Sequence, residues 1–219
     1  MGDARTVTVS SFIAEVQTEL RDPGGNNYTS SELIPYLNRC YDEVYQILVD
    51  KQAEIVRTGS GTLTTVDGTQ SYDLSANSMG DLWVPHRVWI TNYEPMDECE
   101  EEDLYDAINS EELGDSSRTL PDAYCIVGDY IWFKDVPNDA YTVNIRYFPN
   151  FVPVSSSDNL PLKNLFNNEF KEGIKVLAKN RNHIGVNVDA ILKDIFRAGA
   201  MKIIYRRRKR NVRIIPRFR

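Results

Sequence analysis

The sequence predicts an α+β fold in which helices from both ends of the chain form a four-helix layer around an inserted antiparallel β domain, followed by an extended basic C-terminal tail. Apolar residues recur at three- and four-residue steps near both ends. β-branched residues and turn dipeptides fill the middle, and arginine dominates the last fifteen residues. The predicted parts are residues 1–57 and 162–204 for the helical layer, 58–150 for the β domain and 205–219 for the tail.

Composition is that of an ordinary folded protein. The 219 residues are 42% hydrophobic and 26% charged, enough to bury a sizeable core. The three cysteines lack CxxC spacing, which argues against a disulfide framework or a zinc ribbon. No run of 18 apolar residues and no apolar leader segment is present, so we expect a cytosolic product with neither a membrane span nor a secretion signal.

Two helices are expected to open the chain as a hairpin. The first has Ser10 or Ser11 as its expected N-cap. A Pro-, Gly- and Asn-rich turn at residues 22–27 separates it from the second helix, and so short a connection predicts antiparallel packing. The apolar stripe of the first helix is Val9, Phe12, Ile13, Val16 and Leu20.

The second helix has the clearest start signal in the chain. Thr29 and Glu32 have the spacing of a capping box, and Tyr28 and Leu33 stand at the positions of a hydrophobic staple. Pro35 lies in the second turn and predicts a bend. The helix should present one long apolar face made of Leu33, Leu37, Cys40, Tyr41, Val44, Leu48 and Ile55.

About six strands are expected in the middle of the chain, as an antiparallel sheet or small sandwich. Asp67-Gly68 and Gly128-Asp129 each predict a tight turn. The segments expected to pair across these turns are 62–66 with 69–74, and 124–127 with 130–133. Other strands are expected within 83–93 and 141–147.

An acidic segment, residues 94–117, interrupts the strands with eleven acidic residues and no Lys or Arg. It lacks the alternating ligands and central glycine of a calcium loop, so a solvated helix or loop is favoured over an ion site. A Ser- and Pro-rich linker at 149–161 follows. Helical spacing then returns over residues 162–178 and 188–203.

No catalytic, cofactor or metal site is predicted. The two histidines, His86 and His183, have no visible set of catalytic partners. Neither HExxH, GxSxG nor a glycine-rich phosphate loop occurs. An undetected hydrolase that uses the acidic segment with a divalent ion rests on carboxylate density alone.

The tail holds eight Arg or Lys residues and no acid. Without it, 17 basic residues face 32 acidic ones, so an acidic body with a charge of -15 precedes a basic end. Such a cluster is typical of binding to nucleic acid or to an acidic protein surface, or of a solubilising end without a partner. Apolar side chains need a groove to fill, whereas counterion release needs charge alone. The interleaved Val212, Ile214, Ile215 and Phe218 therefore favour protein docking.

The opening stretch resembles a known family. Leu20-Arg21-Asp22-Pro23-Gly24, Tyr28-Thr29 and Glu32-Leu33-Ile34-Pro35-Tyr36-Leu37-Asn38 are similar to the opening of head-to-tail connector (adaptor) proteins of tailed bacteriophages. The segment 62–74 and the tryptophan-containing strand after it stand where that family places its β insertion. The basic end also fits, although it departs from a purely acidic connector.

The resemblance implies a structural virion protein without catalysis. The family forms a ring, typically dodecameric, that binds the portal protein at the head-tail interface and presents a platform to tail or nozzle proteins. DNA would pass through its lumen without sequence-specific contacts, and assembly would take place in the host cytoplasm without a membrane. The resemblance assigns portal docking to Arg206, Arg207, Arg208, Arg210, Arg213, Ile214, Ile215 and Phe218. A nucleic-acid-binding protein using the same tail is the alternative.

Overall fold

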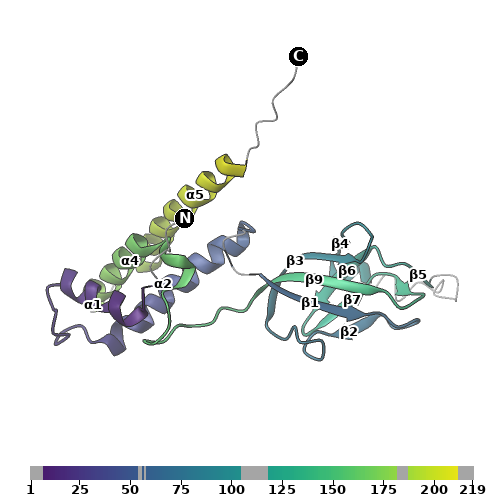
Figure 1. Ribbon diagram of the computed structural model, residues 1–219, viewed down its shortest axis with the longest axis horizontal. Coiled ribbons are helices and arrows are strands. Elements are labelled where there is room, and N and C mark those ends of the chain that lie inside the picture. The colour runs from purple at the N-terminus through teal and green to yellow at the C-terminus, as the bar shows by residue number, and fades with distance from the viewer. Residues whose placement is uncertain (1–6, 54–55, 57, 105–117, 182–186, 212–219) are drawn as a thin grey trace, which may run out of the picture. The chain divides into compact units, whose positions relative to one another are not determined.

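A computed structural model describes residues 7–53, 56, 58–104, 118–181 and 187–211. The chain divides into two units. The helical unit comprises Met1–Val56 and Phe151–Arg219, and the β unit comprises Arg57–Asn150. The predicted α+β class is confirmed in that N- and C-terminal helices pack together and the β-sheets come from the middle of the chain (Figure 1).

The helical unit is built around α2, which packs against α1, α4 and α5. Its helices are α1 (Val9–Glu19), α2 (Ser30–Asp50), the short 3-10 helix η2 (Pro161–Asn164), α4 (Asn167–Asn180) and α5 (Val188–Asn211). The predicted cap of α1 is wrong. Thr8 is the N-cap, and its Oγ1 accepts the Ser11 N–H at 3.3 Å, so the helix begins before either predicted serine.

The predicted apolar face of α2 is buried. Leu33, Leu37, Cys40, Val44 and Leu48 are fully inaccessible to solvent. The helix continues through Pro35 without a break and ends at Asp50. Ile55, which was predicted to belong to the same face, lies outside the described residues. Leu165 lies within residues 162–178, for which the sequence predicts a helix. Because α4 begins only at Asn167, after η2, this side chain is exposed.

Gly173 marks the place where three helices converge. A Cβ on this residue would lie 2.7 Å from Cys40 Sγ of α2 and 2.8 Å from Phe196 Cζ of α5. A side chain there would therefore force the helices apart. Burial raises the pKa of the Cys40 thiol to about 12, so this cysteine is a packing residue and not a nucleophile.

The predicted linker packs on the helical unit. Val9 N–H donates to Asp158 O and Leu160 N–H to Val7 O, both at 2.8 Å. The Asn38 side chain donates to Val154 O at 3.0 Å and accepts the Val154 N–H at 2.8 Å. These bonds satisfy backbone groups that would otherwise need water, and they fix the path of the segment over α1 and α2.

The β unit contains two main sheets and one short pair. The sheet orders are β1-β9-β3, β2-β7-β6-β4 and β5-β8. The strands are β1 (Gly59–Thr64), β2 (Ser71–Asp73), β3 (Leu82–Ile90), β4 (Asp97–Glu98), β5 (Arg118–Thr119), β6 (Ala123–Val127), β7 (Tyr130–Phe133), β8 (Val136–Pro137) and β9 (Thr142–Pro149). Their inward side chains form one core that includes Leu63, Ile131, Phe133, Val143 and Ile145.

The hairpin predicted around Asp67-Gly68 is wrong, whereas the one around Gly128-Asp129 is confirmed. β6 and β7 pair across Gly128, whose φ is +60°. β1 instead pairs with β9 and β2 with β7, so the loop between them crosses from one sheet to the other. The Tyr72 hydroxyl braces this loop by accepting the Val66 N–H and donating to Thr69 O, both at 2.8 Å.

The pairing is also not purely antiparallel, because β4 runs parallel to β6 and β5 parallel to β8. In the acidic segment, β4 is followed by a helical turn at residues 101–104. Residues 105–117, with the rest of that prediction, lie outside the described part of the chain.

Candidate docking surfaces

Four of the predicted docking residues lie within the last turns of α5. That helix continues to Asn211, so the expected extended segment does not begin at Tyr205. The backbone of Arg206, Arg207, Arg208 and Arg210 is helical. The remaining predicted docking residues, Arg213, Ile214, Ile215 and Phe218, lie outside the described residues.

The first half of α5 anchors this basic end in the helical core. Leu192, Phe196 and Ala200 are fully buried, at the four-residue spacing that places side chains on one helix face. Beyond Ala200 the helix loses its buried face, since Met201 is 40% and Tyr205 62% exposed. The yellow end of α5 extends past α4 in Figure 1. The basic run is therefore carried on a helix whose root is held by packing.

The start of α2 differs from the predicted capping box. Thr29 is the N-cap, but its side chain makes no capping bond. Its hydroxyl lies 2.9 Å from Ser31 Oγ. The Glu32 carboxylate instead accepts from the Tyr36 hydroxyl and from Arg181 Nη1, each at 3.1 Å. A partner distant in sequence thus takes the carboxylate that local spacing had assigned to the cap.

Asp22 organises the turn before α2, a role that the sequence reading missed. It is buried, and its carboxylate accepts the backbone N–H groups of Asn26 at 3.1 Å, Asn27 at 2.7 Å and Tyr28 at 2.8 Å. These bonds, that of Tyr28 above all, hold the pKa of Asp22 below its usual value. An Asp ahead of a Pro-Gly-Gly-Asn-Asn stretch was the available signal, because Asp side chains commonly accept from turn backbone.

Arg181, the C-cap residue of α4, links α4 to the turn before α2 and to the first turn of α2. Its Nη1 donates to Asn27 O at 2.9 Å and to the Glu32 carboxylate at 3.1 Å. The guanidinium also lies over the Tyr28 ring, 4.9 Å from the centroid. Sequence spacing gave no indication of this contact, since about 150 residues separate the partners.

Several other exposed charges are paired within the unit. Lys171 Nζ lies 3.0 Å from Glu15 and 2.9 Å from Glu19, and Lys175 Nζ lies 3.1 Å from Glu19. These pairs join α4 to α1. Each adds little stability individually, because the carboxylate of each pair is exposed to solvent, which screens the interaction. Their charges are already matched within the chain, so they are poor candidates for contacts with a partner.

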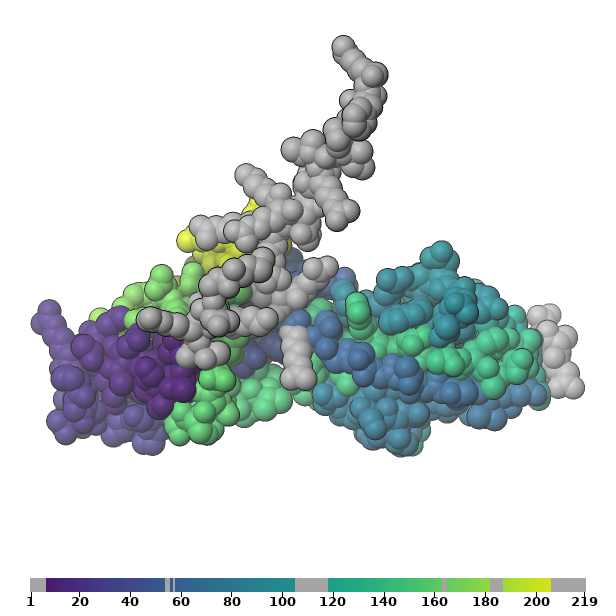
Figure 2. All heavy atoms as spheres, viewed as in Figure 1, coloured from purple at the N-terminus to yellow at the C-terminus, as the bar shows by residue number. Residues whose placement is uncertain are grey.

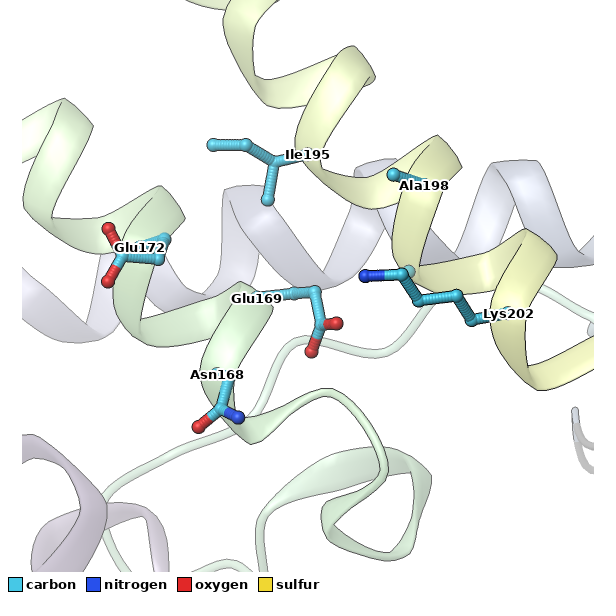
Figure 3. Close-up of a pocket in the computed structure, with 7 residues that line it drawn as sticks. Asn168, Glu169, Glu172, Ile195, Ala198 and Lys202 are labelled. Atoms are coloured by element: carbon cyan, nitrogen blue, oxygen red, sulfur yellow. The ribbon is translucent and has the colours of Figure 1, made fainter.

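An open pocket of about 280 Å³ lies between α4 and α5. Figure 3 shows Glu169 and Lys202 reaching into it from opposite helices. Gly199 allows the helices to approach, because a Cβ there would lie 2.8 Å from Glu169 Cγ. The lining is Asn168, Glu169, Glu172, Ile195, Ala198, Gly199 and Lys202. It offers no nucleophile paired with a base.

The described residues also offer no metal centre. No group of three or more His, Cys, Asp or Glu side chains among them could hold a metal ion. His86 packs beside Phe148, with ring centroids 5.2 Å apart. In the same part of the chain, no helix has the length and apolar character needed to cross a membrane. The described features are those of a binding protein: a helix with a buried root, α5, and the basic segment that it carries.

Comparison with known proteins identifies a matching family. A family model described as "SU10 adaptor protein" matches residues 7–212, a range that extends over both units and ends within the basic C-terminal segment. No curated protein matches the chain.

Proposed function

The chain belongs to the SU10 adaptor protein family, a phage head-tail adaptor family, and from that premise we propose that it forms a ring between the portal and the tail. Family membership gives it a structural, non-enzymatic role in the virion and contacts with other virion proteins. We further propose that the ring is dodecameric, that it extends the DNA channel below the portal, and that it binds tail or nozzle proteins.

One observation supports portal docking most strongly. α5 passes without interruption from the buried Leu192, Phe196 and Ala200 to the arginine run, so its fixed root carries the basic end out of the helical core. At 1.5 Å per residue, Asn211 stands roughly 16 Å beyond Ala200 along the helix. Such a projecting helix can reach a second protein while its own unit stays folded. The docking residues are those predicted from the sequence, Arg206, Arg207, Arg208, Arg210, Arg213, Ile214, Ile215 and Phe218.

Charge supports the channel role. Outside residues 205–219, acidic residues outnumber basic ones by 32 to 17. An acidic lumen repels phosphate and lets DNA slide without binding. The basic end is then separated along the chain from the acidic body, as expected if it contacts a protein above the channel and not the DNA within it.

Two truncations test portal docking. One ends the chain after Asn211 and removes the four outermost docking residues, and the other ends it after Ile204 and removes all eight. We expect purified full-length chain to form a complex with its portal protein, visible by negative-stain electron microscopy. The shorter truncation should weaken the complex and the longer one should abolish it. Circular dichroism checks that both variants fold. Undiminished complex formation after the longer truncation would rule out docking through this end.

A nucleic-acid-binding role remains the second candidate, because eight cations lie within fifteen residues. It predicts DNA affinity that falls steeply with salt. The same two truncations discriminate between the roles. If truncation of the basic end abolishes DNA binding but leaves portal binding intact, the basic end binds nucleic acid and not the portal.

A further inference from the structure

The exposed flank of α5 carries a straight row of side chains. Lys193, Arg197 and Met201 follow one another at four-residue steps, and all three are exposed. Residues four apart on an α-helix stand one above the other, so these three form a ridge along one side of α5. In Figure 2 part of α5, in yellow, is visible at the surface of the helical unit. We call Lys193, Arg197 and Met201 the basic ridge.

The pocket between α4 and α5 opens on the other side of the same helix. Ile195 and Gly199 line this pocket, and Arg197 stands two residues from each of them. At 3.6 residues per turn, a step of two residues turns the side-chain direction by about 200°. The basic ridge and the pocket therefore face opposite sides of α5, and one copy of the chain cannot bring them together.

Glu169 gives the pocket an acidic wall. Its side chain lies flat against α5, because a Cβ on Gly199 would lie 2.8 Å from Glu169 Cγ and 3.0 Å from its Oε1. Figure 3 shows the carboxylate inside the pocket, with Lys202 extending toward it from α5. The charged side chains of the lining are Glu169, Glu172 and Lys202, so acids outnumber bases there. The pocket therefore suits a partner that brings positive charge.

The charges on these two surfaces are not matched within the described part of the helical unit. Its ion pairs include the lysines of α4 but neither Glu169 nor the two cations of the basic ridge. Glu172 already has a partner, since one of its carboxylate oxygens lies 2.5 Å from Lys175 Nζ. Among the described acids of the pocket, Glu169 is therefore the one available to a cation from outside.

We infer that the basic ridge of one copy packs into the pocket between α4 and α5 of the next copy, with Arg197 against Glu169. Side-chain ridges of one helix commonly fill the grooves beside another. An arginine that meets a carboxylate in such a contact adds charge-assisted hydrogen bonds. This inference rests on the proposed ring and names the surfaces that join its copies.

A second copy is the occupant that fits both surfaces. Rotation about a ring axis keeps equivalent residues of all copies at the same height, and a contact between different surfaces of one chain repeats head to tail. Arg197 lies two residues from Gly199, a rise of about 3 Å along α5. The Arg197 side chain of the next copy therefore comes level with Glu169, which lies against Gly199. DNA would suit the ridge alone, because the acidic pocket repels phosphate.

The test reverses the charge of each surface in turn. The pocket variant is Glu169→Lys, which keeps the Cγ that lies against Gly199. It changes the charged lining from two acids and one base to one acid and two bases. The ridge variant is Lys193→Glu with Arg197→Glu, which replaces both cations of the ridge by anions. Self-association of the full chain is measured by sedimentation velocity at low ionic strength, with and without portal protein.

Two control variants match these changes in total charge. Asp50→Lys makes the same change as the pocket variant, and Arg21→Glu with Lys51→Glu makes the same change as the ridge variant. All three positions are exposed in the helical unit and lie outside α4 and α5. Both controls should therefore associate like wild type.

We expect the pocket variant and the ridge variant each to weaken self-association at least about tenfold, because like charges then meet at the contact. An equimolar mixture of the two should recover it, since the basic pocket of one variant binds the acidic ridge of the other. The unchanged ridge and pocket also remain complementary in the mixture. Recovery requires both variants to be folded, so misfolding cannot produce the expected result. If both variants associate like wild type, or if the mixture fails to recover while circular dichroism shows both folded, the inference is wrong.

Two further results would also overturn it. A wild-type chain that binds the portal but makes no contact between copies would leave the proposed portal docking intact and remove this interface. DNA binding that is lost in the ridge variant, with self-association unchanged, would assign the basic ridge to phosphate. Conversely, self-association through the ridge and the pocket without portal binding would support the interface and count against the proposed function.

Discussion

The Asp22 carboxylate accepts the backbone N–H of Tyr28 at 2.8 Å, across a six-residue turn. Because Tyr28 immediately precedes the N-cap of α2, this bond fixes the end of the turn between α1 and α2 and the place where α2 begins. The same carboxylate also accepts from Asn26 and Asn27, so one side chain satisfies three backbone donors that the turn leaves unpaired. The start of α2 therefore depends on a residue of the preceding turn as well as on its own cap.

Asp22 gives the first prediction, a dependence of stability on pH. Its pKa is lowered in the folded chain, so its contribution is fully present above the unfolded value, about 3.9. That contribution is lost as the pH falls through the lower folded value. Asp22→Asn, which keeps one acceptor oxygen but no charge, should lower the melting temperature at pH 7 and reduce its fall below pH 4. Thermal melts followed by circular dichroism check this. An equal acid-induced fall in wild type and variant would contradict it.

Gly25 gives the second prediction. Its φ is +63°, and a Cβ there would lie 2.7 Å from Gln17 Nε2, which donates to Tyr28 O. Gly25→Ala should therefore cost about 1–3 kcal/mol in the free energy of unfolding, through backbone strain and disturbance of that bond. Gly128→Ala is the matched control, because its φ is +60° but nothing lies within 4 Å of an added Cβ. Urea denaturation should show the smaller loss for the control, and equal losses would mean that Gln17 simply moves aside.

Structure that depends on residues close in sequence was predicted more reliably than contacts between segments far apart in the chain. The buried face of α2 and the Gly128 turn follow from 3.6-residue spacing and local turn chemistry, so pattern alone located them. The Asp67-Gly68 turn carried an equally strong local signal. There the pairing of β1 with β9, about 80 residues away, decided the sheet, and no local pattern encodes that choice.

The contacts of the candidate docking surfaces also divide into local features, which the sequence predicts, and contacts between distant segments, which it does not. The basic end was visible as composition, but its helical continuation depends on the packing of α5 through Leu192 and Phe196. The pocket beside α5 could not be found from the sequence, because only the close packing of α4 on α5 at Gly199 places Glu169 there. The Arg181 contact with Glu32 is likewise a product of how α4 ends beside α2.

The core of the helical unit gives the third prediction. Phe170 is fully buried and its ring lies 6.1 Å from those of Phe166 and Phe196, whereas Leu165 is 41% exposed. Phe170→Ala should cost about 3–5 kcal/mol, because it removes buried apolar surface and leaves a cavity. Leu165→Ala should stay within about 0.5 kcal/mol. Urea denaturation measures both, and a large loss for Leu165→Ala would show that this side chain packs more tightly than its exposure indicates.

The fourth prediction concerns coupling between Arg181 and Glu32. Arg181→Lys keeps the positive charge but loses the planar group that lies over Tyr28 and donates to both Asn27 and Glu32. We expect it to lower the melting temperature, by less than Phe170→Ala because the contact is partly open to water. Glu32→Gln removes the charge of the acceptor. If the two residues act together, the double variant should lose less than the two single losses combined. Strict additivity in thermal melts would show that Arg181 acts through Tyr28 and Asn27 alone. Tyr28→Leu, which removes the aromatic face but leaves the Asn27 carbonyl, should then reduce the effect of Arg181→Lys without removing it.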